Sequence, residues 1–152
     1  MDVTLINPIV EGALHILDTT AFVKVKPDTP FLKKDSRPQG DISGILEISG
    51  DLKGSAAISF SEKCILGIVS AMFGEDMTQI NEEITDAVGE ISNMIAGHVT
   101  TKIAEMDKRV KVKFVKVCAG AEKIEHIKEG GVLALPFRTT KGRMVIEVCY
   151  DV

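Results

Sequence analysis

Two carboxylates and an amide recur at helical spacing in the middle of the chain, in the segment DAVGEISNMIAG at residues 86–97. Asp86 and Glu90 are four residues apart and Asn93 follows Glu90 by three, so on a helix these side chains are neighbours. Gly97, which has no side chain, continues the same row. We call these four residues the polar strip. Its acids and its amide offer hydrogen-bonding groups that could reach into a partner molecule.

The polar strip does little for the helix that carries it. Two acids at a spacing of four repel each other slightly, and Gly97 costs a helix about 1 kcal/mol relative to alanine. One interpretation is a solvated face with an incidental glycine. The other is a docking surface on which Gly97 allows close approach of another backbone. The residue types alone leave both interpretations open.

The helix itself is predicted from about Asn81 to Met106. Apolar residues recur along it at intervals of three and four, which is typical of a helix with one buried face. With a turn of about 100° per residue, the buried stripe lies opposite the polar strip. The predicted buried stripe is Ile84, Ala87, Val88, Ile91, Ile95, His98, Val99 and Met106.

The elements that must position this helix lie on both sides of it in the sequence. A first helix begins at Asn7-Pro8 and ends near residue 22, and a short helix is capped by Ser61 and closed by Gly74. The proline-containing segment 26–40 is predicted to be an exposed connector with little regular structure. A β-hairpin is predicted within residues 41–61, and three further strands at 110–118, 131–139 and 143–150.

This order of elements favours an α+β fold. We expect a mainly antiparallel β-sheet that is covered by two long helices and a shorter one. The alternation of apolar and polar residues in the strands predicts that one face of the sheet is covered and the other is wet. The length suits a single domain over residues 1–152.

Composition excludes several classes of function. The 22 acidic and 18 basic residues give a net charge of −4, and the one basic cluster, KRVKVK at 108–113, alternates with valine like the wet face of a strand. We therefore expect no nucleic-acid partner. No apolar run approaches the roughly 20 residues of a membrane span, and the first residues lack the features of an export signal.

The cysteines and histidines indicate structural roles. Cys64, Cys118 and Cys149 are scattered among apolar neighbours, as expected for reduced core thiols of a cytoplasmic protein. His15, His98 and His126 show no metal-ligand spacing, and we expect no metal site. No nucleotide-binding or Ser-His-Asp motif is present.

The string AVGEISNMIAG resembles the signature of the CheX/CheC/FliY family of chemotaxis phosphatases, most closely the CheX branch. The family pattern of Asp or Ser, then Glu, then Asn matches Asp86, Glu90 and Asn93. The SGDLKGSAAISFS hairpin and the SAMFGE helix end are also similar to CheX. In fuller versions of the pattern a proline follows the Asn at the start of a strand, and the corresponding KVKFVKV here has none.

The resemblance implies a phosphatase that hydrolyses the phospho-aspartate of a phosphorylated CheY-like response regulator. It implies that Asn93 positions the attacking water and that Glu90 pairs with a cation, most plausibly a lysine, in the regulator's active site. Asp86 would be an auxiliary partner contact, and Gly97 either clearance for the partner or a helix-packing position. No cofactor of its own is implied, because the Mg²⁺ belongs to the partner.

Two other classes of function stay open. A non-catalytic adaptor of the same fold would bind a response regulator or receptor, and a structural module would self-associate through the glycine of the polar strip. The resemblance also implies a homodimer joined through the β-sheets. We expect residues 131–150 to form its interface, because an unpaired strand edge invites pairing.

Overall fold

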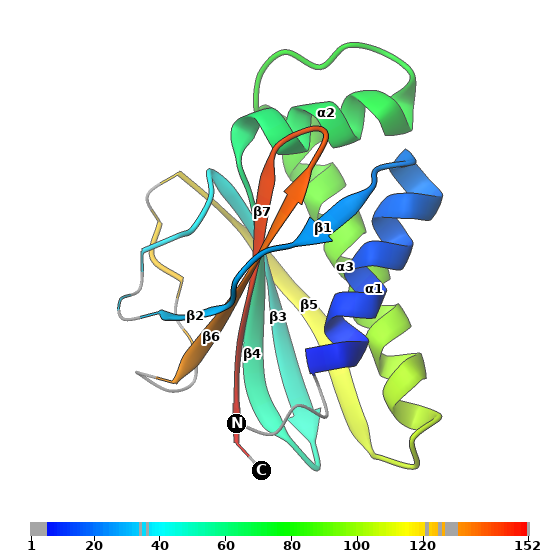
Figure 1. The fold of residues 1–152 in the computed structure, drawn as a ribbon, viewed down its shortest axis with the longest axis vertical. Coiled ribbons are helices and arrows are strands. Elements are labelled where there is room, and N and C mark those ends of the chain that lie inside the picture. Colours follow the sequence, from blue (N-terminus) through cyan, green and yellow to red (C-terminus); the bar gives the residue numbers. More distant parts are fainter. Residues whose placement is uncertain are drawn as a thin grey trace.

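One antiparallel β-sheet with helices packed on it forms the part of the chain that the computed structural model describes, residues 6–33, 35, 37–120, 122–124, 126 and 131–151 (Figure 1). Its strands are β1 (Val25–Pro27), β2 (Phe31–Lys33), β3 (Ile42–Gly50), β4 (Lys53–Phe60), β5 (Val110–Ala119), β6 (Val132–Thr139) and β7 (Arg143–Asp151). The order across the sheet is β1-β6-β7-β4-β3-β5, and β2 also pairs with β6. This confirms the predicted α+β fold.

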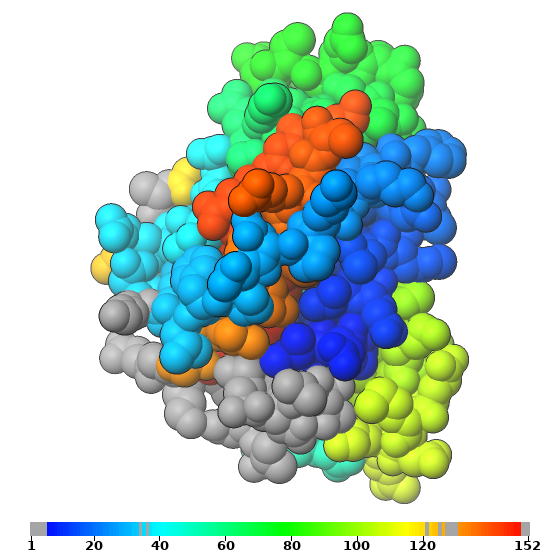
Figure 2. All heavy atoms as spheres, in the orientation of Figure 1, coloured from blue at the N-terminus to red at the C-terminus, as the bar shows by residue number. Residues whose placement is uncertain are grey.

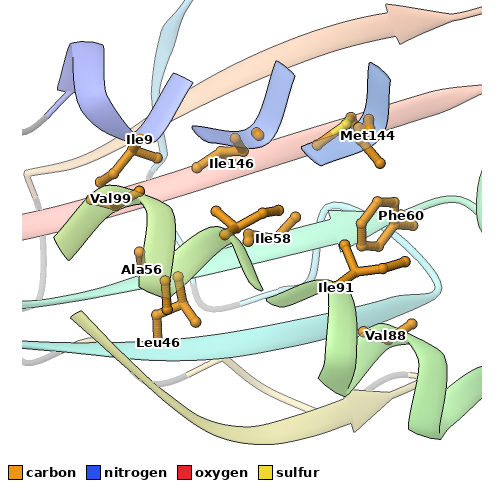
Figure 3. Close-up of a cluster of buried hydrophobic side chains, with 14 of the residues drawn as sticks. Ile9, Leu46, Ala56, Ile58, Phe60, Val88, Ile91, Val99, Met144 and Ile146 are labelled. Atoms are coloured by element: carbon orange, nitrogen blue, oxygen red, sulfur yellow. The ribbon is translucent and has the colours of Figure 1, made fainter. Parts of the chain in front are cut away.

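The three helices are α1 (Ile6–Ala21), α2 (Glu62–Phe73) and α3 (Glu82–Ala104). α1 and α3 lie side by side on one face of the sheet, and α2 lies across one end (Figures 1 and 2). Alternate residues of the central strands point into this helix layer and build the core. Figure 3 shows part of it, with side chains from α1 and α3 against Leu46, Ala56, Ile58, Phe60, Met144 and Ile146.

Local capping explains where α2 and α3 begin. The Ser61 side chain accepts a hydrogen bond from the Cys64 amide at 3.1 Å, and the Asn81 side chain accepts one from the Ile84 amide at 3.2 Å. Each cap satisfies an amide of the first turn that has no partner within the helix. α2 is closed by Gly74, whose φ of 70° lies in the left-handed region that favours glycine.

The end of α3 differs from the prediction. The helix stops at Ala104, and the chain turns through Asp107, whose φ is 59°. Met106 therefore lies beyond the helix and is 46% exposed rather than buried. His98 is only half-buried and stacks on His15 of α1, with ring centroids 4.7 Å apart. The prediction from helical periodicity therefore extended the buried stripe past the real end of the helix.

The proline-containing connector holds two short strands that the sequence did not predict. β1 and β2 pair one after the other with β6, Pro27 opposite Phe137 and Phe31 opposite Ala134. Proline is tolerated at a sheet edge because its missing amide does not interrupt an interior ladder. The connector is therefore partly an edge of the sheet.

The second face of the sheet is wet only in part, because Glu47, Lys111 and Lys113 are exposed there while its middle is covered. Ile124 packs with Ile45, Ala57 and Cys118 on this face. Next to them is a buried polar cluster, in which Lys33 Nζ lies 2.6 Å from Glu147 Oε1, and His126 Nε2 lies 3.2 Å from the same oxygen. His126 Nδ1 also lies 2.7 Å from Ser55 Oγ. The connectors thus cover part of a face that strand alternation assigned wholly to solvent.

The free sheet edge also differs from the expectation. β7 lies between β6 and β4, and β6 lies between β7 and the pair β1 and β2, so residues 131–150 do not form an unpaired edge. At the other side, β5 pairs with β3 and is the last strand in the order. The Thr100 hydroxyl of α3 bonds both the amide and the carbonyl of Val112, at 3.0 and 3.2 Å, and so covers part of this edge.

Candidate active site

The structure places all four residues of the polar strip on the exposed surface of α3. Asp86, Glu90 and Asn93 have exposed side chains, as the helical spacing predicts. Ile84, Val88, Ile91 and Ile95 lie on the opposite side of the helix and are fully buried. Because the helix has 23 residues and packs on both the sheet and α1, it holds the strip on a firm support.

No group within the described part of the chain neutralises the strip. The side chains of Asp86, Glu90 and Asn93 make no hydrogen bond or ion pair to another described residue. Surface carboxylates are often paired with a lysine or arginine at a spacing of three or four, and no lysine or arginine lies at these spacings from Asp86 or Glu90. The acids and the amide of the strip are therefore available to another molecule.

Gly97 leaves space above the helix. A methyl group built on it would meet no described heavy atom within 4 Å. Packing of α3 within the chain therefore does not require this glycine, and its carbonyl is already bound by the Thr101 hydroxyl at 3.1 Å. The geometry thus argues against packing within the chain as the reason for Gly97.

Strand β5 borders the polar strip on one side. The Phe114 ring lies against Gly89, since a methyl group built on Gly89 would come within 3.3 Å of Phe114 Cζ and 3.8 Å of Val117 Cγ2. Phe114 and Val117 are half-buried, and Val115 between them is 49% exposed and has no partner in the register with β3. The sequence analysis did not assign these residues to the site, because it could not tell which strand lies beside α3.

The absence of proline from β5 does not prevent this strand from forming. Val110–Ala119 is a continuous strand, with one irregularity opposite Ile45 and Leu46. The basic cluster within it behaves as predicted, with Lys111 and Lys113 exposed and Val110 and Val112 buried.

The described residues contain no group of three or more His, Cys, Asp or Glu side chains placed to hold a metal ion. Within the same residues, no helix is long and apolar enough to cross a membrane. Cys64, Cys118 and Cys149 are reduced thiols and are buried.

Fold and strip together define a class of protein: a helix-on-sheet domain whose longest helix carries exposed acids and an amide. The model of the family "Chemotaxis phosphatase CheX" matches residues 42–138. This match covers well over half of the sequence and includes the whole polar strip. The chain belongs to the CheX family of chemotaxis phosphatases.

Individual relatives agree with this assignment. The chain is 28% identical over 138 residues to the CheY-P phosphatase CheX of Thermotoga maritima, with 90% of this chain and 88% of the relative covered. A CheC-like superfamily protein of Shewanella has a TM-score of 0.90 and 36% identity over the full length of both chains. The chemotaxis protein CheX of Vibrio vulnificus has a TM-score of 0.86 and 35% identity, with 97% and 99% covered.

Proposed function

We propose that this chain hydrolyses the phospho-aspartate of a CheY-like response regulator and that Asn93 and Glu90 carry the activity. The Thermotoga relative is named for action on phosphorylated CheY, and membership of the phosphatase family supports the same reaction class here. The observation that carries the proposal is the exposed, unpaired Glu90 and Asn93 about one turn apart on the firmly packed α3.

Asn93 is proposed to position the attacking water. An acyl phosphate needs a water in line with the phosphorus, and placement with electrostatic stabilisation supplies most of the catalysis of phosphoryl transfer. A carboxamide can donate to and accept from one water and carries no charge that would repel the phosphoryl group. The Mg²⁺ that neutralises this group is proposed to belong to the regulator.

Glu90 is proposed to orient the complex. Its carboxylate would pair with a lysine beside the regulator's phosphorylated aspartate in a charge-assisted hydrogen bond. Asp86, one turn earlier on the same face, would add a weaker contact. Gly97 would let the partner's backbone approach the helix, in agreement with the open space above it.

The deciding experiment follows decay of a radiolabelled acyl-phosphorylated CheY-like receiver domain with Mg²⁺ present. Wild type is expected to accelerate the decay, and Asn93→Ala is expected to lose the acceleration. Binding of both proteins to the beryllofluoride-activated receiver is measured in parallel, and Asn93→Ala is expected to retain it. Acceleration by Asn93→Ala at the parental rate would refute the assigned mechanism.

The same experiment tests the adaptor alternative. An adaptor would bind the activated receiver without changing the decay of the phosphorylated one. Binding with equal decay in the presence and absence of wild-type protein would therefore favour the adaptor over the phosphatase.

We also propose that the chain forms a homodimer in the cytoplasm. The buried reduced thiols agree with a reducing compartment. We place the pairing between sheets at the edge strand β5, beyond the point at which Thr100 bonds Val112. Sedimentation equilibrium at micromolar concentration tests the dimer, and a monomer throughout this range would contradict it.

A further inference from the structure

Helix α3 lies unusually close to the sheet at Gly44 of strand β3. A methyl group built on Gly44 would lie 1.9 Å from Ser92 Oγ and 2.8 Å from Ser92 Cβ. Real Cβ atoms do not make contacts under 3.0 Å. Rotating the serine hydroxyl would not remove the conflict, because Ser92 Cβ is itself too near. Any side chain at position 44 must therefore displace the helix or the strand.

The contact occupies a gap in an otherwise bulky row. Ile42 and Leu46, which flank Gly44 on the same face of β3, are buried against the helix layer. A glycine inside a strand weakens it and often marks the close approach of another element. Ser92 enters the gap between these large side chains, and Val88 of the same helix lies beside it.

The Ser92 hydroxyl does not explain why serine occupies this gap. Ser92 is fully buried, and its Oγ has no hydrogen-bond partner among the described residues. A buried hydroxyl without a partner costs about 1–3 kcal/mol. Serine therefore fits this gap because its side chain is small.

This contact lies directly behind the polar strip. Ser92 is the residue before Asn93, and Gly89, which rests against Phe114 of β5, is the residue before Glu90. The two contacts converge on one place in the sheet, because Val117 is the register partner of Gly44 and also lies near Gly89. Each of the two proposed functional side chains is thus preceded by a residue at which the helix lies close to the sheet because one of the two contacting residues is a glycine.

We propose that the Gly44–Ser92 contact is a positioning contact that sets how deeply α3 lies on the sheet, and through it the height at which Asn93 meets the phosphorylated partner. The inference rests on the proposed function of Asn93. Placement of a water is sensitive to shifts of about 1 Å, which can cost a hundredfold in rate. Affinity depends on the whole docking surface and responds less.

The test separates kcat from affinity in a set of three variants. Gly44→Ala is expected to lower kcat for the phosphorylated receiver by about tenfold or more, while affinity for the beryllofluoride-activated receiver changes by less than about threefold. Adding Ser92→Gly removes the conflicting Cβ and is expected to restore most of kcat. Adding Ser92→Ala instead keeps the Cβ and is expected to restore little.

Gly12→Ala is the matched control. A methyl group there would meet Val99 Cγ2 at 3.0 Å and His98 at 3.4 Å, so it presses on the same helix from α1, more than one turn beyond Asn93. It is expected to lower the melting temperature with kcat near the parental value. Should Gly44→Ala not fold, Ser92→Cys presses on the same contact from the helix side and is expected to lower kcat in the same sense.

The outcomes distinguish this inference from the proposed function. If Asn93→Ala is inactive and Gly44→Ala retains full kcat, the positioning contact is refuted and the phosphatase mechanism stands. If Gly44→Ala lowers kcat and adding Ser92→Ala restores it as fully as adding Ser92→Gly, the positioning contact is also refuted. Removal of the Ser92 Cβ would then be irrelevant. Full activity of Asn93→Ala would overturn both.

Discussion

Lys33 and Glu147 form an ion pair of 2.6 Å between Nζ and Oε1, with 2% and 0% of their side-chain surfaces exposed. The pair joins β2 to β7 on the sheet face away from α1 and α3. Oε2 of Glu147 has no hydrogen-bond partner among the described residues, so Lys33 and His126 share the other oxygen. The pair fixes the connector between α1 and β3 to the sheet.

Breaking this pair is expected to destabilise the fold without changing the catalytic rate. Glu147→Gln leaves a buried ammonium without its counter-charge and is expected to lower the free energy of unfolding by about 3–5 kcal/mol. Urea unfolding measures the loss. Phosphatase kcat of the folded fraction should stay near parental, because the pair lies across the sheet from the polar strip.

A surface pair provides the control for this prediction. Arg138→Gln removes the exposed contact between Arg138 Nε and Asp28 Oδ2, 2.9 Å long, and is expected to have a much smaller effect. Equal losses of stability for Glu147→Gln and Arg138→Gln would contradict a special role for the buried pair.

Reversing the charge at Glu90 should weaken the complex with the regulator. Glu90→Lys places a cation beside the partner's proposed cation and is expected to raise KM by tenfold or more, about 1.4 kcal/mol or more of binding free energy. The KM of Glu90→Gln should fall between those of wild type and Glu90→Lys. Titrations at low and high salt measure the effect, which should shrink as salt screens the charges. An unchanged KM for Glu90→Lys would remove Glu90 from the interface.

Gly97 offers a test of clearance against self-association. A Cβ built at Gly97 would meet no described heavy atom within 4 Å, and Gly97→Leu improves helix propensity by about 1 kcal/mol, so the fold should not be weakened. If the glycine admits the regulator, Gly97→Leu raises KM while the oligomeric state stays parental. Sedimentation and phosphatase assays on the same sample measure both. Dissociation of an oligomer with unchanged KM would favour the self-associating module instead.

The buried thiols should resist alkylation in the folded protein. Burial raises the pKa of Cys64 and of Cys118 to about 11, from an ordinary value of 9.0. Two pKa units mean about a hundredfold less thiolate at pH 8 than in an unfolded chain. Iodoacetamide labelling followed by peptide mass spectrometry is expected to modify both sites far faster in urea than in buffer. Rapid labelling of native Cys64 would contradict its burial.

The same thiols give stability a pH dependence at the alkaline end. Because the folded pKa lies above the unfolded one, the unfolded chain releases these protons first, and stability falls as pH rises from about 9 to about 11. Below pH 9 the contribution is complete and flat. Urea midpoints at pH 8 and pH 10 measure the decrease, and Cys64→Ala is expected to reduce it.

The two sides of α3 could be read from the sequence. A helix repeats every 3.6 residues, so spacing alone assigns Ile84, Ile91 and Ile95 to the core and Glu90 and Asn93 to the surface. A cap acts over three or four residues, so Ser61 could be predicted as the cap of α2, and the structure confirms it; the predicted start of α3 near Asn81 is confirmed as well. The family pattern then gave the strip a function.

What the tertiary structure decided depends on pairs that are distant in sequence. Lys33 and Glu147 are 114 residues apart, and no local rule signals that a connector will bury its lysine against β7. The contact of Gly44 with Ser92 exists only because β3 is the strand beneath the middle of α3. Strand pairing and helix docking are settled by the packing of the whole core. Local spacing therefore determined which residues of α3 face outward. Only the folded structure determined how far these residues lie from the sheet.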